Sequence, residues 1–338
     1  MEEMKLFDSK ELQKVFDSKD EGSKQVKRGK VLHIPSLDEL GAREQFLSYL
    51  HALGFEWLLE NGNPNISVRL AKEFFTTFRF RVTTDLDEVS ISFRLFEWEI
   101  SMNLIELTVR LGMCSLEEAI GSEWRNRERG IPRRHVGFEP QEAWEELTHP
   151  ASGEFASTLS CSIHSNNPIQ RLVQFHLDFN LLGQSNSAVR TSMTELYLLW
   201  YAKRGRKLHL GFWTAYQCHL IATHPARNLT LCHILGVFVR NNIIITEAEG
   251  LSPQIMVDPP GLFDTPFFVR TNAVYMRQGV PHFYAMGEEA IPTGRTTASQ
   301  GTQDQEQRQE RLEKAVEELA SGRKVSTRSR TKWSWRPG

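Results

Sequence analysis

The sequence predicts a mainly α-helical globular domain that carries one β-hairpin and is followed by a disordered, basic C-terminal tail. Apolar residues recur at helical spacing along most of residues 35–245, they alternate along residues 89–102, and the composition shifts to Thr, Ser, Gln and Gly after Pro292. With 338 residues, of which 40% are hydrophobic, the chain can bury one large core or two smaller ones. We divide it into a charged flexible leader (1–30), a subdomain of helices plus the β-hairpin (31–148), a helical subdomain (149–290), and a disordered linker with a short charged helix and a basic tail (291–338).

The first subdomain is expected to begin with two amphipathic helices. One apolar stripe runs from Leu37 to Leu53 and can end at Gly54, and a second helix is predicted over Ile66–Phe80. The spacing of apolar residues then changes to two on both sides of a turn near Glu97, which predicts the hairpin. Residues 1–30 hold a short helix candidate at Leu6–Phe16 and four closely spaced cations, namely Lys24, Lys27, Arg28 and Lys30.

Two capping boxes follow the hairpin. Asn103 can cap a helix with Glu106 three residues on, and that helix is expected to end at Gly112. Ser115 with Glu118 is an S-x-x-E box, which opens a helix toward Trp124.

The second subdomain is predicted to be a set of helices. The expected ranges are 141–147, 169–182, 191–202 and 212–223, followed by a core helix within the apolar run 229–245. A short KRGRK connection should make the helices at 191–202 and 212–223 an antiparallel pair. Recurrent prolines from Leu251 to Phe283 predict extended segments lying over the core.

Charge and cysteine usage indicate an intracellular protein, nuclear or cytoplasmic. The net charge is −2, and the last seventeen residues hold six basic and no acidic side chains, so subtracting them leaves −8 on the rest. Four irregularly spaced cysteines indicate buried thiols of a reducing compartment. The first residues lack the apolar core of a signal peptide, and no apolar run reaches the length of a bilayer span, so we expect neither secretion nor membrane association.

The basic tail is the candidate nucleic-acid site. Lysine and arginine would neutralise phosphates of RNA or DNA while two indoles stack on unpaired bases. The residues are Arg323, Lys324, Arg328, Arg330, Lys332, Trp333, Trp335 and Arg336. The alternative is a solvated end, whose binding would be weak, salt-sensitive and nonspecific. Upstream, residues 310–319 have coiled-coil spacing over little more than one heptad, which is too short to hold a coiled coil alone.

The sequence carries no recognisable catalytic or cofactor motif. It lacks the glycine-rich phosphate loop, the dinucleotide fingerprint, the H-E-x-x-H pair, the G-x-S-x-G elbow and a retroviral-type protease triplet, so we expect no enzyme, no cofactor and no small-molecule substrate. The best metal candidate gathers Cys218, His219, His224, Cys232 and His233. Adjacent Cys-His pairs point in different directions on a helix, so we interpret these residues as buried thiols and core histidines. Five arginines at 125, 127, 129, 133 and 134 are interpreted as a surface loop with ion pairs.

The segment NNPIQRLVQFHLDFNLLGQSNSAVRTSMTELYLLW, residues 166–200, resembles the first-open-reading-frame protein of Athila-type plant retrotransposons. The matching residues are Asn167-Pro168 with Arg171, Leu181-Leu182-Gly183, Thr194-Glu195-Leu196 with Leu199-Trp200, and the apolar helix near Leu235–Val239. Upstream, ISFRLFEWEISMNLIELTVRLGM is similar to the strand, turn, strand and helix pattern that the family shares in outline with the plant mobile domain. The resemblance spans roughly residues 35–290, with Gln174 where the family pattern has a histidine.

The resemblance implies a retrotransposon-derived, non-enzymatic protein with a structural, assembly or nucleic-acid packaging role. The alternative is a domesticated nuclear protein-interaction factor similar to the plant mobile domain. The family supplies no catalytic residues to transfer, and self-association and binding of RNA or DNA through the tail are the expected partnerships. Arg171 and Glu195 lie near the middle of amphipathic helices, where we expect them to form a buried structural ion pair.

Overall fold

Helices dominate this computed structural model, which describes residues 25–60, 66–82, 89–96, 98–132, 135, 137–156, 165–183, 191–224, 228–242, 257–258 and 260–284. These residues all belong to one compact unit, residues 1–288. The helix candidate at residues 6–16, the linker, the charged helix at 310–319 and the basic tail lie outside the described residues.

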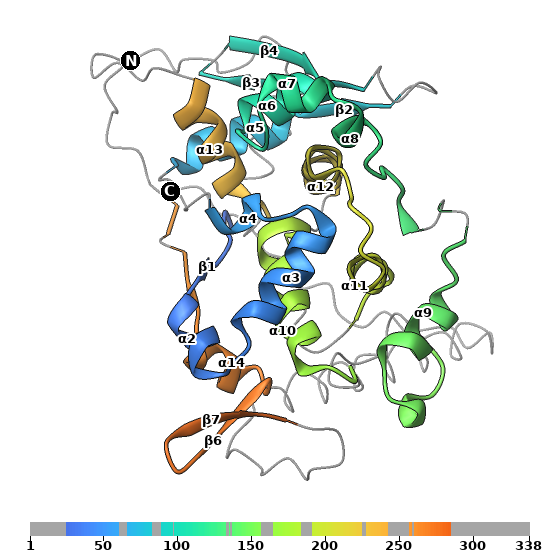
Figure 1. Ribbon diagram of the computed structural model, residues 1–338. Helices are drawn as coiled ribbons and strands as arrows, with labels where there is room; N and C mark the ends of the chain where they lie inside the picture. The colour runs from blue at the N-terminus through green and yellow to red at the C-terminus, as the bar shows by residue number, and fades with distance from the viewer. Residues whose placement is uncertain are drawn as a thin grey trace, which may run out of the picture. The chain divides into compact units, whose positions relative to one another are not determined.

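The described part of the chain is mainly α, as the sequence predicts (Figure 1). Among its helices, none has both the length and the apolar character that crossing a bilayer requires. The helices are α2 (Ile34–Glu39), α3 (Arg43–Leu53), α4 (Trp57–Glu60), α5 (Val68–Thr77), α6 (Leu104–Arg110), α7 (Leu116–Ile120), α8 (Ser122–Arg125), α9 (Pro140–Leu147), α10 (Pro168–Leu177), α11 (Met193–Lys203), α12 (Leu210–Thr223), α13 (Cys232–Asn242) and α14 (Thr265–Arg270), with a 3-10 turn η3 (Pro150–Ser152) and a π-helical turn η5 (Asp178–Leu182).

The predicted β-hairpin is confirmed as β3 (Ser90–Leu95) and β4 (Trp98–Asn103), which pair antiparallel from Leu95 with Trp98 to Ser90 with Asn103. A third strand, β2 (Arg79–Arg81), adds to the other edge of β3. Our prediction of a helix to Phe80 is therefore wrong at its end, because Phe78 turns to extended geometry with ψ 126° and the chain continues as a strand.

Local capping signals were the most accurate part of the prediction. Both capping boxes, after Asn103 and after Ser115, are present, and Gly54 ends α3 in the left-handed region at φ 72°. The stripe from residue 37 to 53 is divided into two helices, because Gly41 has φ 60° and interrupts the backbone. The helix that begins after Ser115 likewise ends before Gly121, whose ψ of 151° is extended.

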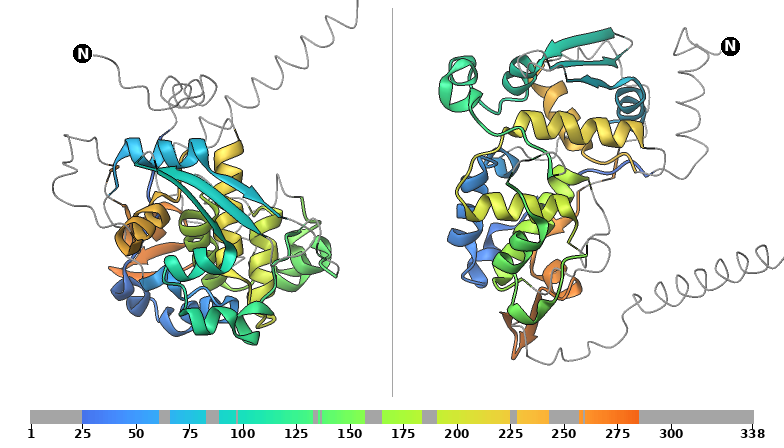
Figure 2. Two further views of the ribbon diagram at one scale, coloured as in Figure 1. Left: turned by 90° about the horizontal axis from the view of Figure 1, so that it is seen from above. Right: turned by 90° about the vertical axis from the view of Figure 1, so that its right-hand side faces the viewer.

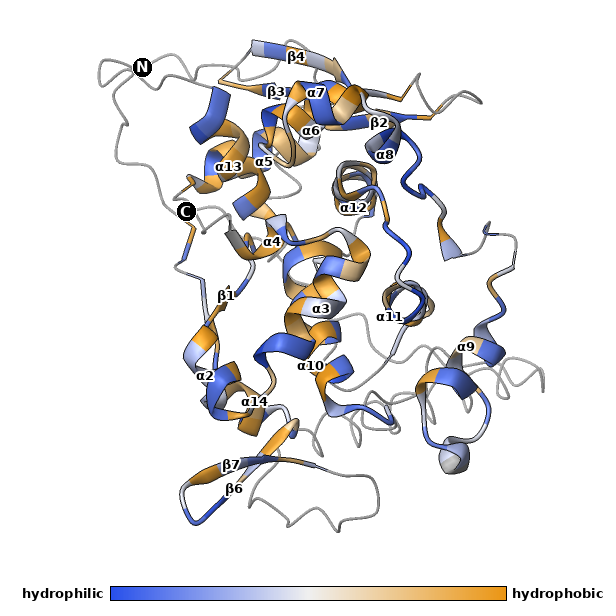
Figure 3. Ribbon diagram, viewed as in Figure 1, coloured by the Kyte–Doolittle hydropathy of each residue, from blue (hydrophilic) through white to orange (hydrophobic). Residues whose placement is uncertain are grey.

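The core joins two groups of elements. The three-stranded sheet packs with α5, α6, α12 and α13 at one end of the unit, and α3, α9, α10 and α11 form a bundle at the other (Figures 1 and 2). The body of α13 is apolar and its C-terminal end is polar, so residues 232–239 are buried and residues 240–242 are exposed (Figure 3). One continuous hydrophobic cluster includes residues from both sides of residue 148, and α3 contacts both α10 and α11. The subdomain boundary at 148 stays a prediction.

Helices α11 and α12 are both viewed along their axes in Figure 1, and a short segment joins them. Their contact includes Tyr197 stacked on Trp213, with ring centroids 6.0 Å apart. However, α11 packs mainly against α3 and α9, which the sequence analysis did not anticipate.

The proline-rich segment 251–283 is only partly extended. Strand β5 (Leu262–Phe263) pairs in parallel with β1 (Val31–Leu32), and β6 (Val274–Arg277) and β7 (Val280–Phe283) form a second hairpin. Between them α14 forms, where we had expected extended chain. Asp264 caps this helix by accepting from the Phe267 N–H at 2.9 Å, and a proline in the first turn is compatible with a helix start.

Candidate cationic cleft

Residues 25–30, which we call the strap, are an ordered part of the fold. The Lys27 N–H donates to the Leu229 carbonyl at 2.8 Å, and the Leu229 N–H donates to the Gln25 carbonyl at 3.0 Å. Just beyond the strap, the Val31 N–H donates to the Gly261 carbonyl at 3.1 Å. The expectation of a loosely attached leader through residue 30 is thus wrong for the strap, because its backbone groups bond to residues 150 or more positions away.

Polar groups beneath the strap fix its position. The Gly29 N–H donates to His233 Nδ1 at 3.2 Å, so the proton of this ring is on Nε2, which donates to the Asn180 carbonyl at 3.2 Å. The Asn180 side chain accepts from the Lys30 N–H at 2.9 Å and donates to His176 Nδ1 at 3.1 Å. Burial lowers the pKa of His176 to about 3 and that of His233 to about 4, so both rings are neutral acceptors at physiological pH.

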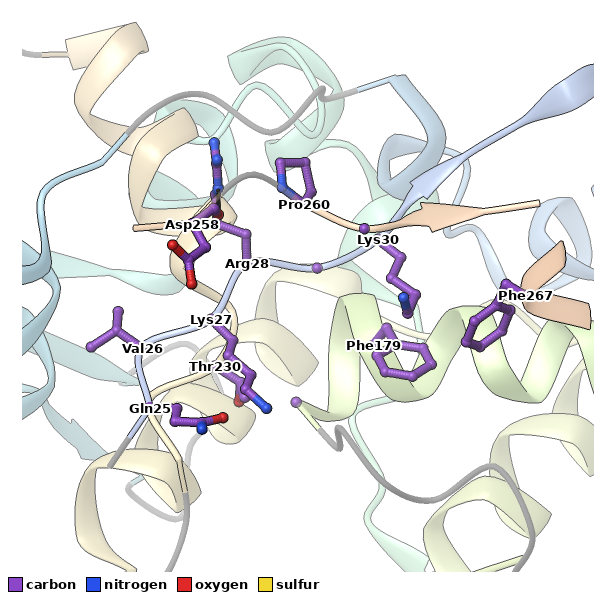
Figure 4. Close-up of a pocket in the computed structure, with 13 residues that line it drawn as sticks. Gln25, Val26, Lys27, Arg28, Lys30, Phe179, Thr230, Asp258, Pro260 and Phe267 are labelled. Carbon is purple, nitrogen blue, oxygen red and sulfur yellow. Dashed lines mark hydrogen bonds between the residues drawn. The ribbon is translucent and has the colours of Figure 1, made fainter. Parts of the chain in front are cut away.

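A cleft of about 560 Å³ opens beside the strap (Figure 4). Arg28 extends to one side, where its guanidinium donates to the Asp258 carbonyl at 2.9 Å and to the Val257 carbonyl at 3.3 Å. Figure 4 shows Lys27 and Lys30 extending to the other side. The cleft is lined by Gln25, Val26, Lys27, Arg28, Gly29, Lys30, Phe179, Gly183, Thr230, Asp258, Pro260, Gly261 and Phe267.

The ammonium group of Lys30 is held between two aromatic rings. It lies 4.9 Å from the centroid of Phe179 and 4.5 Å from that of Phe267, as a cation–π contact requires. Among the described residues no oxygen accepts a hydrogen bond from it. Burial, followed by the nearby Arg270 charge, lowers the pKa of Lys30, whereas Asp264 acts in the opposite direction. Among the described carboxylates, Asp264 offsets the charge of Lys30, and Asp258 offsets that of Arg28.

A second cation and a buried hydroxyl lie farther along the cleft. The Lys27 ammonium has no ion-pair or hydrogen-bond partner within the described ranges, and neither does the Thr230 hydroxyl, although Thr230 is only 5% exposed. The lining residue Gly183 has φ +65°, and a Cβ at that position would lie 2.1 Å from Thr230 Oγ1. Glycine therefore satisfies both the backbone conformation and the space beside the hydroxyl.

The metal candidate of the sequence analysis is dispersed in the structure. Cys218 and Cys232 are buried, and burial raises the pKa of both thiols. The Cys232 thiol donates to the Leu229 carbonyl at 3.2 Å, and His233 accepts from the Gly29 N–H of the strap. Within the part of the chain that the structure describes, no three potential ligands come together in a geometry that could hold a metal ion.

The predicted ion pair between Arg171 and Glu195 does not form. The Arg171 guanidinium donates to the carbonyls of Asn272 at 2.6 Å and Thr271 at 2.9 Å, so it ties α10 to the segment after α14. Glu195 instead accepts from the Ser192 N–H at 2.6 Å and from Gln174 Nε2 at 3.1 Å. Both side chains are buried, as expected, but each has polar neighbours of its own, and burial raises the pKa of Glu195.

The arginine-rich segment is partly described. Arg127 forms an ion pair with Glu123 at 3.8 Å and stacks on the Trp124 ring at 3.8 Å from the centroid. This agrees with a surface segment that contains ion pairs. Arg133 and Arg134 lie outside the described residues.

The cleft is not among the sites that the sequence analysis named, although His233 of the metal candidate bonds to its strap. The tail residues at 323–336 lie outside the described ranges, so their proposed role stays a prediction. The cluster of cations before residue 31 was visible in the sequence, but its partners Phe179, Thr230 and Phe267 are 149 or more positions away. No local pattern connects them to the strap.

Comparisons with known proteins indicate no function for this chain. The chain has no match among family models, curated proteins or solved structures. The resemblance to Athila-type proteins therefore stays a prediction, and the cleft is the feature from which function is argued.

Proposed function

We propose that this protein is a non-enzymatic, retrotransposon-derived protein that binds nucleic acid and serves in assembly or packaging. The observation that carries the proposal is the pair of cations, Lys27 and Lys30, that line one cleft and make no hydrogen bond or ion pair to a carboxylate among the described residues. A nucleic-acid backbone supplies closely spaced phosphates, and their neutralisation by lysine releases condensed counterions. The resemblance to Athila-type proteins and the absence of catalytic motifs in the sequence support a binding role over catalysis.

The charge distribution favours a local contact with nucleic acid. The whole chain has a net charge of −2, so an overall positive field does not draw it to polyanions. Binding must then come from cations that lie close together, and the strap places such cations in the cleft within a few residues of one another. The basic tail, as the sequence predicts, would add a second contact and strengthen binding through multivalency.

The test is binding of single-stranded RNA by the full chain at two salt concentrations. We expect salt-sensitive binding that weakens in Lys27→Gln and in a chain truncated after Pro292. Arg277→Gln is the matched control, because this exposed side chain on β6 removes one positive charge outside the cleft. RNA binding that is absent at low salt, or equally reduced in Arg277→Gln, would contradict the proposal.

A nuclear protein-interaction factor, similar to the plant mobile domain, is the second candidate. Exposed apolar side chains favour it, since Trp98 on the edge strand β4 is 74% exposed, and Leu116 and Ile120 on α7 are 59% and 55% exposed. Aromatic residues of this kind are enriched at protein interfaces. Light scattering separates the candidates: growth into large assemblies on adding RNA supports packaging, and an unchanged monomer supports a protein partner.

A further inference from the structure

We infer that the cleft holds two linked phosphate groups of one ligand, one beside Lys27 and Thr230 and the other beside Lys30. The inference rests on the proposed function where the two phosphates belong to neighbouring nucleotides of a strand. A free diphosphate compound has the same chemistry, and the experiment below separates these two sources.

The first phosphate position is formed where the strap pairs with the chain before α13. The hydrogen bond from Lys27 N–H to the Leu229 carbonyl places Lys27 alongside Thr230. The Thr230 hydroxyl is buried, lines the cleft and has no partner among the described residues. A buried polar group that lacks a partner is unfavourable, so an acceptor or donor at this position stabilises the protein. A phosphate oxygen accepts from both the hydroxyl and the ammonium group.

The second phosphate position is at the ring-bound ammonium of Lys30. Its two aromatic neighbours fix its place but neutralise none of its charge. A second cation lies near the same ring, since the Arg270 guanidinium is 5.8 Å from the centroid of Phe267, and its charge lowers the pKa of Lys30. Asp264, the carboxylate whose charge acts on Lys30, already caps α14 by accepting from the Phe267 N–H. An anion at this position would offset both cations.

The surroundings of the two lysines favour two phosphates over one. The Lys30 ammonium is held between Phe179 and Phe267, whereas Lys27 extends beside Thr230, so the two cations have separate surroundings within one cleft. Figure 4 shows both side chains on the same side of the strap. Asp258 also lines the cleft, but it lies beside Arg28 on the opposite side of the strap, where it counters that guanidinium.

The test is calorimetric binding of inorganic pyrophosphate and inorganic phosphate to the full chain, with chloride adjusted to constant ionic strength. We expect pyrophosphate to bind at least about tenfold more tightly than phosphate, because it engages both positions. Lys27→Gln, Lys30→Gln and Thr230→Val should each weaken pyrophosphate binding by about tenfold, the loss of one hydrogen bond to a charged group. Thr230→Ser keeps the hydroxyl and should restore binding, and Arg277→Gln should leave it unchanged.

Competition with single-stranded RNA separates this inference from the proposed function. If pyrophosphate displaces RNA, the cleft holds a strand and both ideas stand. If RNA binds but pyrophosphate neither binds nor displaces it, the two-phosphate site is overturned and the packaging role stands. Pyrophosphate binding without RNA binding would overturn packaging and identify a free diphosphate compound as the ligand. If Thr230→Ser binds as weakly as Thr230→Val, the hydroxyl has no part in the site.

Discussion

Replacing Asn180 by alanine should loosen the strap at Lys30 while leaving the rest of the fold in place. The Asn180 side chain makes two hydrogen bonds: its oxygen accepts from the Lys30 N–H at 2.9 Å, and its nitrogen donates to His176 Nδ1 at 3.1 Å. Its carbonyl bond with His233 is a main-chain contact that alanine retains. The change therefore removes the strap's attachment at one residue and leaves a buried ring nitrogen without its donor.

The expected loss of stability follows from these two bonds. Leaving a buried donor or acceptor without its partner costs about 1–3 kcal/mol. Because the ring of His176 is fully buried, the loss of its donor should cost close to the upper end of that range. The half-buried Lys30 is partly reached by water, so the loss of its acceptor should cost less. We therefore expect the free energy of unfolding to fall by about 2–4 kcal/mol.

Urea denaturation followed by tryptophan fluorescence measures the loss, and amide hydrogen exchange shows where it acts. Exchange at Gly29 and Lys30 should speed up more than exchange in α10. Asn241→Ala is the matched control, since this exposed amide makes a 3.4 Å bond to the Arg110 carbonyl and should change stability by less than about 0.5 kcal/mol. Equal stability of the Asn180 and Asn241 variants, or strap exchange that does not change, would refute the reasoning.

Acid should destabilise the protein through buried histidines with lowered pKa values, about 3, 3 and 4 for His176, His209 and His233. Their folded pKa values lie below the unfolded value of about 6.5, so their contribution to stability is complete above pH 6.5 and is lost as the pH falls toward 4. The expected loss at pH 5 is up to about 2 kcal/mol per ring. Urea titrations at pH 7.5 and pH 5 that coincide would contradict this. Phe93→Ala should cost about 3–5 kcal/mol in thermal or urea unfolding, because its ring packs 4.9 Å from Phe74 and 5.3 Å from Phe238, whereas the exposed Trp98→Ala should cost little. Thiol reagents at pH 8 should label Cys218 and Cys232 of the folded chain slowly, as mass spectrometry can follow, since both are buried and burial raises the pKa of both thiols; rapid labelling of these two residues would refute their burial.

Predictions from the sequence succeeded where one short window contains the cause. The capping residue Asn103 and its partner Glu106 are three positions apart, and the alternation of β3 and β4 spans a few residues on each side of one turn. These signals need no information from the rest of the chain. The error at Gly41 has a different origin, because apolar spacing continues across a glycine whether or not its backbone leaves the helix.

The misses concern contacts between distant segments. The proline-rich segment was expected to be extended, but a capped helix, α14, forms there and packs its phenylalanines into the core. Arg171 was assigned an acidic partner, yet main-chain carbonyls of Thr271 and Asn272 accept its hydrogen bonds. Every residue has a main-chain carbonyl, so a pattern of side chains cannot predict which carbonyls will accept a hydrogen bond. The cleft escaped prediction for the same reason, since its walls meet only in three dimensions.

The strap also constrains when the molecule can complete its folding during synthesis. Its partners lie far along the chain: Gln25 bonds to Asn228, and Arg28 to Asp258, across separations of 203 and 230 residues. At roughly 5–20 residues per second, a ribosome needs about 10–50 s to make that intervening stretch. Residues 25–32, the first described part of the chain to leave the exit tunnel, are therefore among the last to find their places. Throughout that interval their cations are available to whatever polyanion lies near the ribosome.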